Sequence, residues 1–472
     1  PLWSRGLGDV YKRQEDGKSM VLGRTVELNY LNTYFDKAGS QLMIAYGERG
    51  ADKLALLMEF ADGKPFHYYR ARPASLKEQL IQWNRELWEQ SGISKDSISF
   101  FGLLNSLSEK QKKKIVVIID EFQLMIRENG SFMEELIRYL HKKEQEEGVM
   151  VILCSSQVSF VENSLISKIG AAAYEITGFL KIKELPFSCI GEYFPAFSRQ
   201  ECIEAYSVLG GMPGLWKYFD DKLSVRENIC RTILNPESGL YTEGRREMEE
   251  QLRETGVYDT ILSALSSGQK KLNDLYRHTG FSRAKISVYL KNLMELEIAE
   301  KVFSYDTEGK AAAQKGIYRI SNHFLHFYYK FIYQNASGLQ RLPADMFYER
   351  YIAPGLRTYI ADYFKKICMQ SLQMWSENGK LPFRAEEFGE WVGKFGNIDL
   401  IAKGEGKTLI GLCNYENEVF RYDDYEWLLF CAKKAQLSVD YVYLFSVTDF
   451  EDALNRESKQ KEYLRLLTLD EI

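Results

Sequence analysis

The stretch that decides the fold is Gln41-Leu42-Met43-Ile44-Ala45-Tyr46-Gly47-Glu48-Arg49-Gly50-Ala51-Asp52-Lys53-Leu54-Ala55-Leu56-Leu57-Met58-Glu59-Phe60. A short apolar run ends at Gly47, and an apolar pattern with helical spacing follows Lys53. This is the layout of a strand, a phosphate-binding loop and a helix, in which backbone N–H groups and the helix N-terminus hold phosphate oxygens and a lysine reaches the outer phosphates. The sequence therefore predicts a nucleotide site that includes Gly47, Arg49, Gly50 and Lys53.

The loop departs from the full pattern G-x-x-x-x-G-K-[ST] at two positions. Asp52 stands where the second glycine belongs, and Leu54 stands where the magnesium-binding hydroxyl belongs. A carboxylate about 5 Å from a phosphate charge costs ~3 kcal/mol at an effective dielectric of 20, which is roughly a hundredfold in affinity. Because aspartate tolerates left-handed backbone better than most residues, the loop shape can persist. The two replacements argue against efficient hydrolysis.

A second strand, Ile115-Val116-Val117-Ile118-Ile119, ends in the two carboxylates Asp120 and Glu121. Five β-prone apolar residues before two acids are typical of a buried parallel strand whose carboxyl end faces a ligand crevice. In this Walker B form, Asp120 would hold magnesium through its water shell and Glu121 would polarise the attacking water. The alternative is a buried strand that ends in acids at the start of a helix; the loop upstream favours the nucleotide interpretation.

Two further features each have two interpretations. Ser155 follows the strand Met150-Val151-Ile152-Leu153-Cys154 and would either sense the terminal phosphate or cap the strand. Pro213 lies in the turn Gly210-Gly211-Met212-Pro213-Gly214, which would either pack against an adenine base or simply break a helix.

Alternating strands and helices from Val21 to about Leu185 predict a parallel sheet with helices on both faces.

Residues 257–320 read as three helices and a hairpin, the pattern of a winged helix-turn-helix. The third helix, predicted over 283–298, would present Arg283, Lys285 and Lys291 to a DNA groove. Acidic residues follow closely, so the alternative is a winged helix that only packs against neighbouring domains. The lysine run 112–114 is a further basic feature.

The last third, from Asn322, is rich in aromatic residues and contains two adjacent predicted strands. Asp399 on the first resembles the metal-site aspartate of restriction-type nucleases, in which a Glu-x-Lys follows on the next strand. Leu412 and Asn414 occupy those two places here. Since magnesium takes several hard oxygen ligands, one carboxylate predicts no nuclease activity.

The composition of the chain limits the classes of function and the cellular location that the sequence allows. The net charge of -5 does not indicate a protein whose whole surface attracts polyanions. A nucleic-acid contact would therefore have to be confined to a local basic patch. Seven scattered cysteines argue for reduced thiols in the cytoplasm, and no apolar run approaches the roughly 18 residues that span a bilayer. His323 and His326, three residues apart, are read as packing residues rather than metal ligands.

These patterns predict five segments. Residues 1–19 resemble translated adapter sequence ahead of Met20 and are excluded from the fold. Residues 20–187 form the P-loop ATPase core, 188–244 a helical lid, 245–320 the winged helix, and 321–472 an α/β domain like a restriction nuclease.

Taken together, the chain resembles the prokaryotic, archaeal-type P-loop ATPases of the AAA+/STAND superfamily that carry a C-terminal domain of unknown function with a restriction-nuclease-like fold. The resemblance rests on these stretches: Gly23-Arg24 with Glu27-Leu28, Tyr46-Gly47 with Lys53, Asp120-Glu121, Ser155-Ser156-Gln157-Val158-Ser159-Phe160, Gly210-Gly211-Met212-Pro213, Tyr318-Arg319-Ile320-Ser321 and Ile398-Asp399-Leu400. It implies ATP and Mg²⁺ as cofactors and places Pro213 at the nucleotide pocket.

The departures from the family lie at chemical positions. Members usually read Gly-Lys-Thr where this chain has Asp52-Lys53-Leu54. If the alignment ahead of Thr177 holds, Glu175 replaces a candidate arginine finger, whose loss alone is worth roughly 10³–10⁵ in rate in comparable systems. The resemblance therefore implies an ATP-binding regulatory or interaction protein with little or no hydrolysis.

Two alternatives stay open at this point: an active ATPase switch coupled to DNA through the winged helix, and a non-enzymatic nucleic-acid binding module. The protein partner and the oligomeric state are not indicated by the sequence.

Overall fold

The computed structural model describes residues 21–91, 99–108, 113–128, 131–144, 146–305, 316–394 and 396–472. The predicted leader at 1–19 and Lys112 of the lysine run lie outside the described residues. The chain forms two compact units. The first runs to Leu185 and includes Met212–Gly214, and the second contains Pro186–Gly211 and Leu215–Ile472.

The first unit is built on a five-stranded sheet in the order β2-β3-β4-β1-β5, and every neighbouring pair is parallel. Its strands are β1 (Gln41–Tyr46), β2 (Phe66–Arg70), β3 (Ile115–Asp120), β4 (Val149–Ser155) and β5 (Gly178–Lys181). Because all strands run the same way, the loop after β1 and the acids after β3 reach the same edge, with the end of β4 between them.

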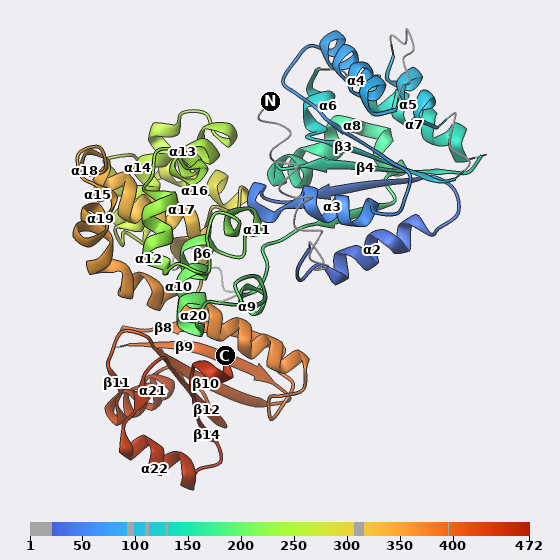
Figure 1. The fold of residues 1–472 in the computed structure, drawn as a ribbon. Helices are drawn as coiled ribbons and strands as arrows, with labels where there is room; N and C mark the ends of the chain where they lie inside the picture. Colours follow the sequence, from blue (N-terminus) through green and yellow to red (C-terminus); the bar gives the residue numbers. More distant parts are fainter. Residues whose placement is uncertain are drawn as a thin grey trace. The chain divides into compact units, whose positions relative to one another are not determined.

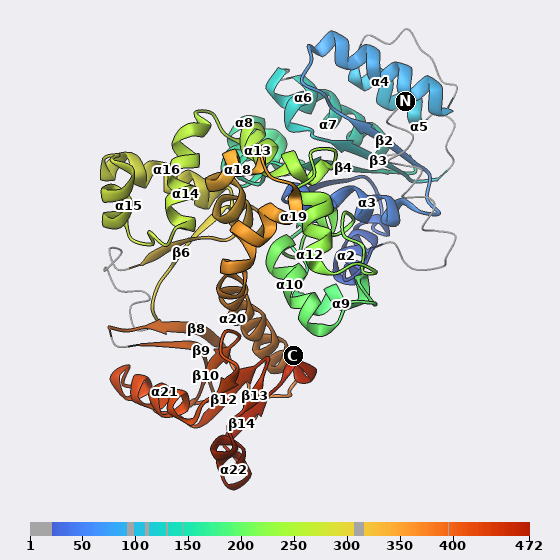
Figure 2. The same ribbon diagram turned by 60° about the vertical axis from the view of Figure 1, so that its left-hand side comes forward.

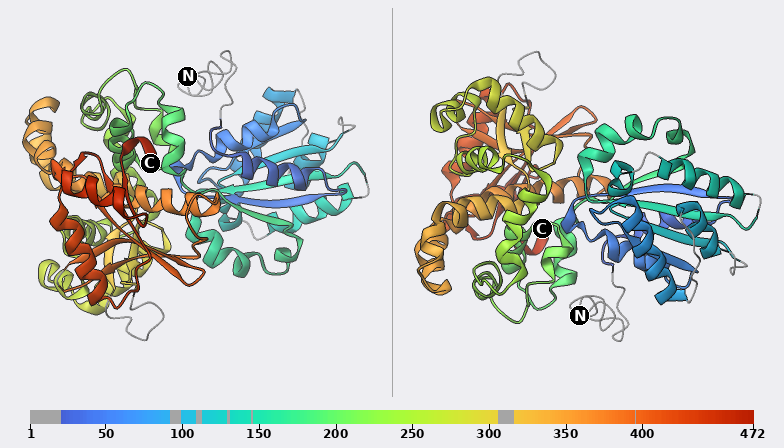
Figure 3. Two further views of the ribbon diagram at one scale, coloured as in Figure 1. Left: turned by 90° about the horizontal axis from the view of Figure 1, so that it is seen from below. Right: turned by 90° about the horizontal axis from the view of Figure 1, so that it is seen from above.

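Helices cover both faces of this sheet (Figures 1 and 3). One face carries α2 (Thr25–Phe35) and α3 (Lys53–Ala61); the other carries α4 (Leu76–Ser91), α5 (Phe100–Ser108), α6 (Gln123–Glu128), α7 (Ser131–Glu144) and α8 (Leu165–Ile169). Strands covered on both faces are rich in apolar side chains, and β1 and β4 are buried throughout, with polar residues only at Gln41 and Ser155. The predicted parallel sheet is confirmed.

The second unit begins with α9 (Ile190–Tyr193), α10 (Arg199–Leu209), α12 (Val225–Asn228) and α13 (Gly239–Gln251). The one-turn helix α11 (Pro213–Trp216) contains residues of both units. Ser198 and Glu201 form a capping box at the start of α10, which satisfies N–H groups that the helix leaves unpaired. The helix ends at Gly210, whose φ is 65°.

The winged helix follows with α14 (Thr255–Ser266), α15 (Leu272–Thr279), α16 (Arg283–Glu295) and the antiparallel pair β6 (Ala299–Val302) and β7 (Ile317–Ile320). The Ser282 hydroxyl caps α16 by accepting from the Lys285 N–H. The helix ends before the predicted Ile298 because Glu297 adopts left-handed backbone, with φ 59°. The three helices and the hairpin are otherwise those expected from the sequence.

A mixed sheet closes the chain, in the order β14-β12-β10-β9-β8. Its strands are β8 (Glu387–Val392), β9 (Asn397–Gly404), β10 (Lys407–Asn414), β12 (Tyr441–Ser446) and β14 (Leu464–Leu467). The long helix α20 (Ala353–Glu377) packs on one face, and α21 (Tyr422–Lys434) and α22 (Asp452–Gln460) pack on the other (Figure 2). Short helices α17 (His323–Phe327), α18 (Ala336–Leu339) and α19 (Ala344–Phe347) precede it, and β11 (Val419–Phe420) pairs with β13 (Asp449–Phe450).

The predicted fold class is thus confirmed: a parallel P-loop sheet, a helical region with a winged helix, and a C-terminal domain with a mixed sheet. All seven cysteines are free thiols. Among the described residues, no helix combines the length and the apolar character that crossing a membrane requires.

Candidate nucleotide site

The phosphate-binding loop keeps its shape although its second glycine is replaced. Asp52 has φ 57° and ψ 45°, which is the left-handed conformation that glycine adopts most readily. Aspartate is among the few other residues that visit this region routinely. The chain can therefore turn at Asp52 and start α3 at Lys53, as a glycine would allow.

Lys53 points into the loop rather than to solvent. Its side chain is buried, and its ammonium donates to the carbonyl oxygens of Gly47 at 3.0 Å and Glu48 at 2.9 Å. A lysine ammonium has three donors, so these two bonds leave one for an incoming anion. The loop thus holds a positive charge at the place where the sequence predicts phosphate binding.

Both loop glycines lie close to neighbouring segments, Gly47 to backbone and Gly50 to a side chain. A Cβ on Gly47 would lie 2.1 Å from the carbonyl oxygen of Ile182, and one on Gly50 would lie 3.0 Å from the Met212 Cβ. On the opposing turn, a Cβ on Gly214 would lie 3.0 Å from the Gly50 carbonyl oxygen. The turn that carries Pro213 is therefore seated directly on the loop.

Arg24 holds the loop from its other side, a role that the sequence did not reveal. Its guanidinium is buried and pairs with Glu27 at 2.9 Å. It also donates to the carbonyl oxygens of Ala51 at 3.2 Å and Lys183 at 2.7 Å. One side chain therefore ties the loop to the start of α2 and to the segment after β5.

Asp120 ends β3 with both carboxylate oxygens in use. Oδ1 accepts from the Glu121 N–H at 3.0 Å, and Oδ2 accepts from the Tyr68 hydroxyl at 3.0 Å, with the Arg70 Nε 3.9 Å away. Burial raises the pKa of Asp120, and the Glu121 carboxylate raises it further, against the opposing effects of Tyr68, Arg70 and Lys53. Tyr68 and Arg70 come from β2, and no pattern in the sequence indicates their contact with Asp120.

Glu121 is held by the end of the neighbouring strand. Its backbone has φ 53°, and its carboxylate accepts from the Ser156 hydroxyl at 2.7 and 2.9 Å and from the Gln123 amide at 2.5 Å. The predicted Ser155 lies next to this contact but is fully buried, and its hydroxyl accepts from the Gln157 N–H at 3.0 Å. The serine that meets the acid is therefore Ser156.

The other positions singled out in the sequence are exposed or lie away from the phosphate-binding loop. Arg49 is exposed in a one-turn 3-10 helix (Arg49–Ala51), and Leu54 is 36% exposed at the start of α3. The Glu175 carboxylate lies 3.1 Å from His141. Since β5 begins beside Met43, the residues just before it lie toward the sheet edge opposite to Gly47. Within this unit, Glu175 is not beside the loop.

In the C-terminal sheet, both carboxylate oxygens of Asp399 contact protein donors. Its Oδ1 lies 3.0 Å from the Lys365 ammonium of α20, and its Oδ2 accepts from the Cys413 N–H at 3.1 Å. The Asn414 amide donates to Asn417, Ser446 and Thr448. Across the described part of the chain, no three His, Cys, Asp or Glu side chains gather as a metal-ion site.

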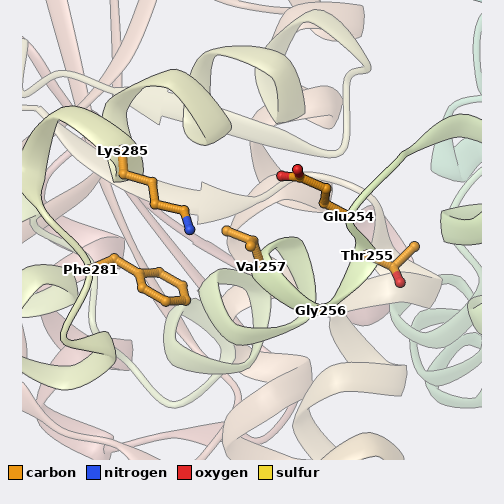
Figure 4. Close-up of a pocket in the computed structure, with 6 residues that line it drawn as sticks. All are labelled: Glu254, Thr255, Gly256, Val257, Phe281 and Lys285. Atoms are coloured by element: carbon orange, nitrogen blue, oxygen red, sulfur yellow. The ribbon is translucent and has the colours of Figure 1, made fainter.

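The winged helix exposes basic side chains on α15 and α16. Between residues 270 and 291, six lysines and arginines accompany one acidic residue, Asp274, so the segment carries +5 against -5 for the whole chain. Arg283 lies over the Tyr276 ring and donates to Asn273, and Lys291 lies 3.7 Å from Glu295. Lys285 faces Glu254 across a shallow, open hollow (Figure 4).

Three family models match successive parts of the chain. Residues 22–219 match an ATPase domain predominantly from Archaea. Residues 260–301 match the bacterial regulatory proteins of the arsR family, and residues 328–424 match archaeal and bacterial proteins of unknown function. The three matches follow the order of the parallel sheet, the winged helix and the C-terminal domain.

An uncharacterized protein of Methanocaldococcus jannaschii is 27% identical over 395 residues, which cover 81% of this chain and 84% of that protein. A Walker-type ATPase of Pyrococcus abyssi is 17% identical, with a TM-score of 0.48 over 66% of this chain and 97% of the other. The ORC2 protein of Aeropyrum pernix is 14% identical, with a TM-score of 0.42 over 72% and 94%. Residues 22–219 are thus similar to an ATPase domain found predominantly in Archaea, and segments similar to the arsR family and to a family of unknown function follow in the chain.

Proposed function

We propose that the protein binds ATP, hydrolyses it slowly or not at all, and acts as a regulatory or interaction protein. The observation that carries the proposal is the buried Lys53 ammonium, fixed inside an intact loop with one donor to spare. The nucleotide site would comprise these residues: Gly47, Arg49, Gly50, Lys53, Ser155 and Pro213. STAND-type membership and a restriction-nuclease-like C-terminal domain are parts of the same proposal.

Weak turnover follows from the groups around the expected phosphate. Leu54 supplies no hydroxyl, and the Glu121 carboxylate already accepts hydrogen bonds from Ser156 and Gln123. A carboxylate occupied in this way is poorly placed to orient an attacking water, because it must first give up those bonds. An arginine finger would have to come from another chain or from elsewhere in this one, and its absence costs roughly 10³–10⁵ in rate.

Thermal unfolding of the full chain tests ATP binding. At an ATP concentration a hundredfold above Kd, binding stabilises the native state by about 2.7 kcal/mol. We expect the midpoint to rise by roughly 5–10 °C, given about 2–4 °C per kcal/mol for a domain of this size. The measurement is made both with magnesium and with EDTA.

Lys53→Ala is expected to remove this rise, and Lys53→Met separates loss of the charge from loss of the buried stem. Lys77→Ala, at the exposed start of α4, is the matched control and should keep the full rise. No rise in either buffer for the unmodified chain would contradict ATP binding. Phosphate release at about 1 s⁻¹ or faster, abolished by Glu121→Gln, would contradict weak turnover.

A second candidate function, DNA binding by the winged helix, is favoured by the +5 charge of residues 270–291. The outer face of α16 presents Ala284, Ser287 and Val288, small side chains that leave room for a groove wall. Arg283 and Lys291 flank that face. Such a surface can combine phosphate contacts with apolar contacts to thymine methyl groups.

The double variant Arg283→Ala/Lys291→Ala tests this surface. If both cations contact phosphates, the slope of log affinity against log salt becomes shallower by about 2 for duplex DNA, and binding weakens for every sequence alike. Fluorescence anisotropy with a labelled duplex measures both quantities. Lys433→Ala/Lys434→Ala on α21 is the control, and equal effects of the two double variants would assign binding to general charge.

A further inference from the structure

The donor set at the end of β3 does not fit the magnesium ion that the family resemblance implies. Magnesium prefers near-octahedral oxygen ligands and usually takes one or two protein carboxylates together with phosphate oxygens and water. Leu54 offers no oxygen at the position next to Lys53. Each oxygen of Asp120 already accepts a hydrogen bond, from the Glu121 N–H and the Tyr68 hydroxyl, so a metal ion would have to share each oxygen with a protein donor.

A guanidinium lies beside the Asp120 carboxylate, on the neighbouring strand β2. Arg70 is the direct partner of Asp120 in the pairing of β2 with β3, and its Nε lies 3.9 Å from Asp120 Oδ2. The Arg70 side chain is 51% exposed at the edge of the sheet where the loop opens. Because a guanidinium stays charged at all relevant pH values, its positive charge is permanent.

The Asp120 carboxylate would repel a bound phosphate unless its negative charge were compensated. Where a divalent cation normally separates a carboxylate from the phosphates, here Arg70 and the Tyr68 hydroxyl compensate the carboxylate charge themselves. Lys53 supplies the second positive charge from inside the loop. Arg70 thus supplies positive charge that a magnesium ion would otherwise bring, in addition to the lysine charge that phosphate-binding loops contain.

We propose that this site binds the phosphates of a nucleoside triphosphate without a divalent cation, and that Arg70 makes this binding independent of magnesium by neutralising Asp120. The inference rests on the proposed ATP binding and concerns its metal requirement. Arg70 is a positioning residue here, since it acts through Asp120.

Calorimetric titration of the full chain with ATP, in magnesium and in EDTA, tests the proposal. We expect the two Kd values to agree within about twofold. Affinity that falls tenfold or more in EDTA would overturn the inference while leaving ATP binding in place. Absence of binding in both buffers would overturn the inference and the proposed function together.

The variant Arg70→Met tests the role of the guanidinium directly. Without the guanidinium, Asp120 repels the phosphates, so we expect Kd in EDTA to rise roughly tenfold and magnesium to restore most of the loss. A merely structural role would weaken binding equally in both buffers. Arg72→Met is the matched control, because Arg72 follows two residues later and pairs with Glu86 at 2.8 Å, away from Asp120. Equal behaviour of the two variants would overturn the assignment to Arg70.

Discussion

Lys365→Met lowers the free energy of unfolding of the second compact unit by about 3 kcal/mol, because it leaves the buried Asp399 carboxylate without its counter-ion. Only 6% of the Asp399 side chain is exposed, so water solvates its carboxylate poorly once the ammonium is lost. Burial by itself lowers the pKa of Lys365, but the Asp399 carboxylate outweighs burial and the net shift is upward. Urea unfolding followed by tryptophan fluorescence measures the loss.

The neighbouring Lys366 provides the matched control. Its ammonium lies 3.6 Å from Glu300, and that carboxylate keeps Arg319 at 2.6 Å when the lysine is removed. Lys366→Met should therefore cost less than about 1 kcal/mol, as for other partly exposed pairs. Adding Asp399→Asn to Lys365→Met should recover part of the stability. A cost for Lys365→Met no larger than for Lys366→Met would contradict the argument.

The same contacts bear on the comparison with nucleases. A catalytic aspartate must present its oxygens to a metal ion, whereas both Asp399 oxygens meet protein donors. Asn414 holds its own loop together through hydrogen bonds to Asn417, Ser446 and Thr448. These contacts tie Asp399 to α20 and to β10, and they hold the loop after Asn414 in place.

Much of the fold could be predicted because its signals are local. Five β-branched residues before Asp120 can only be a buried strand, and the spacing from Gly47 to Lys53 defines a loop between strand and helix. The exchange of glycine for aspartate at position 52 also behaves as expected, since aspartate adopts the left-handed turn. In each case a few consecutive residues carry the information.

The contacts that tune the site could not be predicted, because they join distant segments. Tyr68 and Arg70 reach Asp120 only through the register of β2 against β3, which the sequence does not specify. Choosing between Ser155 and Ser156 requires knowing which side chain leaves the end of β4 toward Glu121. Lys365 meets Asp399 from α20, although the two residues are 34 positions apart in the sequence. Such contacts depend on how distant segments pack in the tertiary structure, and no short stretch of sequence indicates them.

The two histidines that the sequence marked as packing residues should make the second unit sensitive to acid. His323 is buried with its Nδ1 2.8 Å from the Tyr206 carbonyl oxygen, and the His326 Nδ1 lies 2.8 Å from the Tyr363 hydroxyl. Burial, together with the charges of Lys330, Lys366 and Lys270, lowers the pKa of His326 to about 3. Burial and Lys366 lower the pKa of His323 well below its ordinary value as well.

Both rings are therefore neutral in the folded unit but take up protons in the unfolded chain below a pH of about 6.5. Their contribution to stability is complete above that pH and is lost progressively as the pH falls toward 3, at about 1.4 kcal/mol per pH unit for each ring. Between pH 6.5 and pH 5 we expect a loss of about 2 kcal/mol per histidine, measured as the urea midpoint against pH. His326→Gln should reduce this slope by about half while the exposed His278→Gln leaves it unchanged. An identical slope in the unmodified chain and in His326→Gln would show that paired carboxylates, rather than these rings, set the acid sensitivity.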